Sequence, residues 1–182
     1  MKKIIALLIM MAVGTGVYAQ GEALSKFFAK YATDESFTTA TISSKMFSLI
    51  TNMDVETPED KELVDAISKL KGLKVLGKEN TSDARSLYKE AYALVATKDY
   101  EELMSVRDKD KDMKFFIRES SGKINELIMV MGGTDDFMLL TLFGEIDLKQ
   151  ISRIGRKMDV GGLDHLEKIH HGGDKKDEKK KN

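Results

Sequence analysis

The sequence predicts an α+β domain: an antiparallel β-meander of three to four C-terminal strands plus one or two earlier strands, with helices packed mainly on one face. Two observations support this fold class. Apolar residues recur at helical spacing in the first half of the chain, whereas from about Tyr100 they form short runs separated by clusters of turn residues. Helices followed by hairpin-connected strands are typical of α+β domains.

Four helices and two strands are expected before Tyr100. The expected helices span residues 22–32, 44–53, 57–72 and 84–96, and the expected strands span residues 37–43 and 73–77. In the second helix, Met46, Phe47 and Ile50 recur at helical spacing. The third helix has the clearest signals, because Thr57 is a good N-cap residue, Pro58 fits the first turn, and Gly72 would end the helix.

The second half is expected to form the meander and a final helix. Its strands are predicted at residues 101–107, 113–119, 123–131 and 136–146, with turns at Asp108–Asp112, Ser120–Lys123 and Gly132–Asp136. Asp147 and Gln150 form a capping box for a helix that would end at Gly161–Gly162. The predicted buried side of this helix comprises Leu148, Ile151, Ile154 and Met158.

The N-terminus has the pattern of a secretory signal peptide. Lys2 and Lys3 precede the apolar run 4–13, and Ala19 lies where a signal peptidase would cut. We therefore expect a signal peptide at 1–19, a single α+β domain at 20–160 and a flexible, charged C-terminal tail at 161–182. The protein would be exported, to the periplasm or the outside of the cell, with no transmembrane segment after cleavage.

Composition narrows the classes of function further. The chain has no cysteine, so neither a disulfide, a zinc–thiolate site nor a lipid-anchored cysteine is expected. Its 29 basic and 30 acidic residues give a formal net charge of −1. The last nine residues hold five lysines and three acidic residues, so the body of the chain is more acidic than the chain as a whole. This balance argues against a nucleic-acid partner.

The segment 127–144, LIMVMGGTDDFMLLTLFG, is the most apolar part of the body. Each apolar arm is about half as long as a membrane helix, so a β-hairpin turned by GGTDD is the better interpretation. Its arms are apolar at consecutive positions, so both faces need cover. The hairpin is then either a buried centre or a surface for a partner or apolar ligand. The candidate contact residues are Met129, Met131, Phe137, Met138 and Leu140.

No catalytic residue, metal site or cofactor is predicted. His165, His170 and His171 have poor spacing for chelation on a helix, and a solvated tail explains them. The alternating acids in Asp108–Asp112 lack the glycine and closing glutamate of a calcium loop, so a charged hairpin turn is the better interpretation. The segment Ser43–Lys45 lacks the spacing of a serine–lysine nucleophile pair, and Ser44 fits a helix cap.

The signal peptide that ends in Ala-Gln, the segment ISSKMF at 42–47 and the meander that closes in FGEIDLKQISRI at 143–154 resemble one known family. These are small exported Bacteroidota proteins catalogued as domain of unknown function four-two-five-two. The resemblance covers roughly Glu22 to Met158. It implies no catalytic residues, because the family is uncharacterised, and it implies an occasional association with extracytoplasmic-function sigma factors.

These observations predict an exported envelope protein that acts as a non-catalytic binding or accessory module through its apolar hairpin. Its partner would be an envelope protein or an apolar ligand. A regulatory component of a sigma-factor-linked envelope stress circuit is the alternative that the family association implies. An enzyme acting on envelope material is a third class, which the sequence does not favour because no set of nucleophile, base and oxyanion donors assembles.

Overall fold

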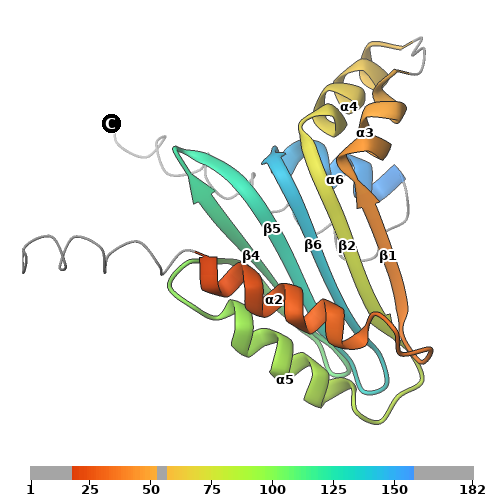
Figure 1. Cartoon of the computed structure of the whole chain (residues 1–182), viewed down its shortest axis with the longest axis vertical. Coiled ribbons are helices and arrows are strands. Elements are labelled where there is room, and N and C mark those ends of the chain that lie inside the picture. The colour runs from red at the N-terminus through yellow and green to blue at the C-terminus, as the bar shows by residue number, and fades with distance from the viewer. Residues whose placement is uncertain (1–17, 53–56, 158–182) are drawn as a thin grey trace, which may run out of the picture.

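The computed structural model describes residues 18–52 and 57–157, which contain five helices and one six-stranded antiparallel sheet. The predicted α+β meander is therefore confirmed (Figure 1). In chain order the elements are α2 (Tyr18–Tyr31), β1 (Thr38–Ser43), α3 (Ser44–Thr51), α4 (Pro58–Ser68), β2 (Leu70–Lys78), α5 (Ala84–Val95), β3 (Glu101–Arg107), β4 (Asp112–Ser120), β5 (Lys123–Gly132), β6 (Phe137–Ile146) and α6 (Leu148–Lys157).

The strands lie in the order β1-β2-β6-β5-β4-β3, and every neighbouring pair is antiparallel. Strands β3 to β6 form the expected C-terminal meander. The two earlier strands extend the sheet on the β6 side, with β2 paired to β6 and β1 paired to β2. The hairpin of β5 and β6 therefore lies in the middle of the sheet, with two strands on each side.

Helices α2 and α5 cover one face of the sheet, which we call the first face (Figure 1). The core between them contains Leu76, Val130 and Leu139, all fully buried. The rings of Phe27 in α2 and Phe137 in β6 meet edge to face, with their centroids 6.2 Å apart. Alternate residues of the central strands thus bury their side chains against these two helices.

The opposite, second face has its own core, so the expectation that the helices pack mainly on one face is wrong. Side chains from the other three helices take part in it, including Phe47 of α3, Ile67 of α4 and Ile151 of α6. They pack with second-face residues of the strands such as Leu127 and Leu142. Helices α3 and α4 lie at the end of the sheet where β1 stops and β2 starts (Figure 1).

The predicted caps at Thr57 and Asp147 are confirmed, whereas the predicted cap at Ser44 is wrong, because Ser44 is the first residue of α3 and the N-cap position is Ser43. The Thr57 hydroxyl accepts a hydrogen bond from the Asp60 backbone N–H at 3.1 Å, at the start of α4. At the start of α6, Asp147 Oδ1 accepts from the backbone N–H groups of Lys149 and Gln150, at 2.9 and 3.2 Å. These two starts are set by local hydrogen bonds, which explains why the sequence reveals them.

The predicted end of α4 at Gly72 is wrong. The helix ends at Ser68, and residues from Leu70 onwards form β2. Leu70 is buried in the second-face core and lies opposite Gly144 of β6, while Gly72 lies opposite Phe143. Sheet pairing at this position outweighs the helical spacing that Leu70 shares with the preceding helix.

Several expectations lie outside the described residues. These are residues 1–17 of the predicted signal peptide, Met158 and the expected helix end at Gly161–Gly162, and the tail at 161–182. The predicted cleavage point after Ala19 falls in the first turn of α2. Within the described part of the chain, no helix has both the length and the apolar character needed to span a membrane.

Candidate functional site

The apolar segment 127–144 forms most of the central hairpin of the sheet, which is made by β5 and β6. Met129 lies opposite Leu140, Met131 opposite Met138, and Gly132 opposite Phe137. The turn is closed by the Gly133 N–H, which donates to the Asp136 carbonyl at 2.6 Å. The prediction of a β-hairpin turned by GGTDD is therefore confirmed.

Three of the five candidate contact residues are core residues. Met129, Phe137 and Leu140 are 0%, 1% and 4% exposed. Phe137 packs on the first face, and the other two pack in the second-face core. This corrects the prediction that they contact a partner, because a side chain without free surface cannot bind an added molecule. The reason is that side chains of the helices and of neighbouring strands pack around these three positions.

Met131 and Met138 differ from these three, because each is only partly buried. The strand register places Met113 of β4 opposite Met131 and Met131 opposite Met138. Residues directly opposite each other in antiparallel strands point to the same face. The three side chains, each partly buried, therefore form a row across three adjacent strands, which we call the methionine row.

The methionine row lies on the second face, at the end of the strands next to the GGTDD turn. Helices α3 and α4 lie toward the opposite end of the sheet (Figure 1). On β2, the residue opposite Met138 is Gly77, which has no side chain to cover it. Thioether side chains are soft and adjust their shape to an apolar partner. Met131 and Met138 of this row are thus the apolar residues of the segment 127–144 that retain surface on the second face.

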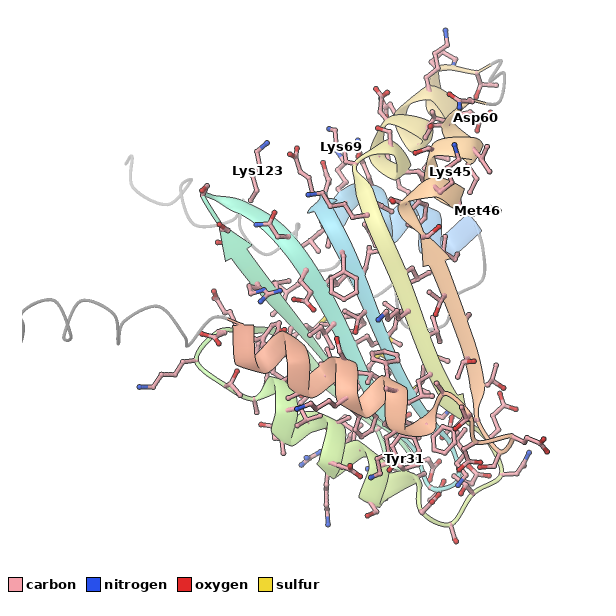
Figure 2. The ribbon with its side chains drawn as sticks, in the orientation of Figure 1. Tyr31, Lys45, Met46, Asp60, Lys69 and Lys123 are labelled. Atoms are coloured by element: carbon pink, nitrogen blue, oxygen red, sulfur yellow. The ribbon has the colours of Figure 1, made fainter. Side chains whose placement is uncertain are left out.

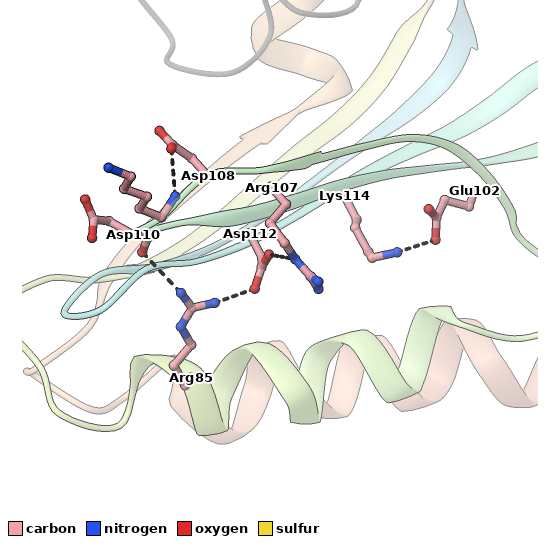
Figure 3. A network of polar contacts seen from close by, with 8 residues as sticks. Arg85, Glu102, Arg107, Asp108, Asp110, Asp112 and Lys114 are labelled. Atoms are coloured by element: carbon pink, nitrogen blue, oxygen red, sulfur yellow. Dashed lines mark hydrogen bonds and ion pairs between the residues drawn. The ribbon is translucent and has the colours of Figure 1, made fainter.

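The Asp108–Asp112 turn is held by arginines (Figure 3). The Asp112 carboxylate pairs with Arg107, whose Nε lies 2.7 Å from Oδ1, and with the Nη1 of Arg85 in α5. Hydrogen bonding to Arg107 is the main cause that lowers the pKa of Asp112, and Arg85 adds to it. Arg85 also donates to the Asp110 carbonyl at 3.3 Å, so the network joins the β3–β4 turn to α5.

This network agrees with a charged hairpin turn at DKDKD. The Asp108 carboxylate accepts from the Lys109 N–H at 2.7 Å, within the turn itself. Farther along the strands, Lys114 pairs with Glu102 at 2.6 Å (Figure 3). No group of three or more histidine or acidic side chains is placed to hold a metal ion within residues 18–52 and 57–157.

A buried polar cluster lies on the first face and was not found from the sequence. Glu126 of β5 is 1% exposed, and its Oε2 accepts hydrogen bonds from Tyr100 Oη, at 3.1 Å, and from Arg118 Nη2. The Arg118 guanidinium also lies 5.4 Å from the centre of the Tyr100 ring. The signal in the sequence was an acid within the apolar segment NELIMVM, whereas its position opposite Arg118 follows only from the strand register.

Burial dominates the electrostatics of this cluster. It raises the pKa of Glu126, although the Arg118 charge and two hydrogen bonds act in the opposite direction. Burial is also the main cause that raises the pKa of Tyr100. The adjoining cavity, lined in part by Leu24, Phe28 and Glu126, measures about 40 Å³. That volume suits a few water molecules and is far below that of a small-molecule site.

Helix α3 presents a second apolar surface. Met46 and Leu49 are 50% and 53% exposed, and they are the large hydrophobic side chains with the greatest exposure in the described part of the chain. Met46 shares the predicted helical spacing with Phe47 and Ile50, but only Phe47 of the three is buried, so Met46 lies on the outer side of α3. In a helix of eight residues, one side chain buried against the sheet fixes which neighbours face outward.

Comparison with known proteins gives one match. The family model described as "Domain of unknown function (DUF4252)" matches residues 31–154. The match runs from the end of α2 into α6, so it includes the central hairpin, the methionine row and the Tyr100–Arg118–Glu126 cluster. Searches of curated proteins and of solved structures found no match.

Proposed function

Because the chain belongs to the DUF4252 family, whose description names no activity, we propose its function from its own geometry. The protein is an exported protein of the cell envelope that acts without catalysis, as a binding or accessory module. Its contact surface includes the methionine row, and its partner is another envelope protein that offers an apolar segment. The signal-peptide pattern of residues 1–19 supports the envelope part of this proposal.

One observation carries the binding role: on the second face, the apolar side chains of the segment 127–144 are buried except for Met131 and Met138. Met129 and Leu140 pack into the second-face core, whereas Met131 and Met138, on the same face, keep exposed surface. Partly exposed methionines aligned on adjacent strands form an apolar surface that adapts to a partner of irregular shape.

The polar groups support the non-catalytic part of the proposal. The Glu126 carboxylate is paired with Arg118, and the Asp112 carboxylate is paired with Arg85 and Arg107. A general base or nucleophile must reach a substrate, whereas these carboxylates are each held by guanidinium groups within the fold. Their contacts join strands and helices, which is a structural use.

Immobilised protein exposed to envelope extract tests the binding role. We expect wild type to retain a partner that the double variant Met131→Asp, Met138→Asp retains at least about tenfold less, because desolvating a carboxylate in an apolar contact is unfavourable. Met46→Asp is the matched control, since it makes the same change at an exposed methionine on α3. It should retain the partner as wild type does.

Two checks make the result interpretable. If the aspartate pair unfolds the protein by circular dichroism, the pair Met131→Gln, Met138→Gln replaces it, because glutamine keeps the size of methionine. A folded double variant that retains the partner as well as wild type overturns the proposal.

Export is tested separately. The chain recovered from the envelope fraction should begin at Gln20, because a signal peptidase would cut after Ala19.

A further inference from the structure

The sheet has two outer strands, β1 and β3, and only one side of each is paired with a described strand. The other side presents a row of backbone N–H and C=O groups. Such an edge is a template for pairing with another strand unless the protein protects it. The two edges of this sheet differ sharply in how they are protected.

Strand β3 carries the usual protection. It has charged residues at Glu101, Glu102 and Arg107, and its pairing with β4 contains a register shift between Glu102 and Met104. Charges and bulges at an edge both disfavour the addition of another strand. This edge is therefore unsuited to strand pairing.

Strand β1, with the sequence TTATIS, lacks these devices. It contains neither a charged residue nor proline, and its register with β2 is regular from Thr38 to Ser43. Five of its six side chains are exposed, and the sixth, Ile42, is partly buried. The residues are small or β-branched, which fits them to a pleated surface on either side. The edge of β1 is therefore open, regular and uncharged over its full length.

The ends of β1 carry opposite charges. The exposed Glu35 lies in the turn before the strand. The exposed Lys45 follows the strand, at the start of α3, and Figure 2 labels it. No ion pair joins either residue to another side chain within residues 18–52 and 57–157. Two copies of β1 in antiparallel order would bring the acidic end of each next to the basic end of the other.

We propose that β1 pairs antiparallel with β1 of a second copy of this chain, which joins two six-stranded sheets into one continuous sheet. A two-fold axis through Ala40 places Thr38 opposite Ile42 and Thr39 opposite Thr41 of the second copy. Each of these pairs shares a face, as antiparallel pairing requires. The same axis places Glu35 near Lys45, so the edge is complementary to itself in shape and in charge.

Helix α3 extends this surface. It begins at Ser44, directly after β1, and it carries the exposed Met46 and Leu49. In the dimer, α3 of each copy lies beside the start of β1 of the other, where these side chains lose contact with water. The paired strands alone bury little area, so the dimer should form reversibly and depend on protein concentration.

Sedimentation velocity over a range of protein concentrations tests the proposal. Wild type should change from monomer to dimer as concentration rises. Ala40→Lys should raise the dissociation constant of the dimer at least about tenfold, because it places two lysines opposite each other on the axis. Ala93→Lys is the matched control, since Ala93 is an exposed alanine on α5, and this variant should dimerise as wild type does.

Charge exchange tests the orientation. Lys45→Glu alone and Glu35→Lys alone should each weaken the dimer, and the double variant should restore it, because only the single changes place like charges together. Restoration would not follow if the two strands paired in parallel order. The methionine row takes no part, so Met131→Gln should leave the dimer unchanged and this result is independent of the binding test.

Three results would overturn the proposal. One is a wild-type protein that stays monomeric at the highest concentration reached. Another is a dimer that Ala40→Lys leaves intact, which would place the interface elsewhere. The third is a monomer that dimerises only after residues 161–182 are deleted, which would mean that the chain's own C-terminal segment occupies the edge.

Discussion

Glu126 has the one fully buried carboxylate among the side chains that the structure describes. Burial raises its pKa in the folded protein above the ordinary value of 4.5, despite the nearby Arg118. A folded state that holds its proton to higher pH than the unfolded state gains stability at low pH. That contribution is fully present below the unfolded pKa and is lost as the pH rises through the folded pKa.

Replacing Glu126 by glutamine should remove this dependence. We expect the stability of wild type relative to Glu126→Gln to increase as the pH falls from 7 toward 4.5, measured by urea unfolding at several pH values. Because the two proteins share their other titrating groups, the difference between their free energies of unfolding reports the contribution of Glu126. Glu119→Gln is the control, because Glu119 is an exposed glutamate on β4, the strand that pairs with β5. A difference between wild type and Glu126→Gln that stays constant with pH would contradict the assignment.

At Gly144 the backbone itself leaves no room for a side chain. Its φ is +131°, and a Cβ there would lie 2.4 Å from the Lys69 carbonyl oxygen and 2.7 Å from Leu70 Cα. Gly144→Ala should therefore lower the free energy of unfolding by about 2–4 kcal/mol in urea titrations. At Gly72 the new Cβ would meet its neighbours at 3.6 Å, so Gly72→Ala should cost less than about 1 kcal/mol. Equal costs would contradict this explanation.

At the scale of elements, the sequence predicted what local patterns determine. Strands β3 to β6 begin and end within about one residue of the predicted ranges, because alternation and turn clusters mark them. Strand β2 was predicted at 73–77 but runs from Leu70 to Lys78. Its first residues continue the helical spacing of α4, and only their pairing with β6 makes them a strand.

The candidate surfaces were harder to predict, because they depend on which strands become neighbours. Met113, Met131 and Met138 come from three strands, and no local pattern shows that they form a row. The pairing of Arg118 with Glu126 likewise depends on the register of β4 and β5. The open edge of β1 follows from the strand order, since FTTATIS reads equally well as an interior or an outer strand.

The whole molecule has two cores that share one sheet. Leu139 packs with α2 and α5 on the first face, while its neighbour Leu140 packs on the second face. Each central strand contributes alternate residues to both cores, so neither core can form without the same backbone pairing. We therefore expect the described domain to unfold as a single cooperative unit.

Tyrosine fluorescence provides a probe of the first-face core, because the chain has no tryptophan. Four tyrosines pack on this face: Tyr31, Tyr88, Tyr92 and Tyr100. Leu140→Ala removes a buried side chain from the second face, at an expected cost of about 2–5 kcal/mol. If the two cores are coupled, the urea midpoint should fall equally by tyrosine fluorescence and by far-ultraviolet circular dichroism. Leu139→Ala, the matched change on the first face, should shift both probes together as well. A tyrosine transition that stays at its wild-type midpoint in Leu140→Ala would instead mean that the second-face core unfolds independently.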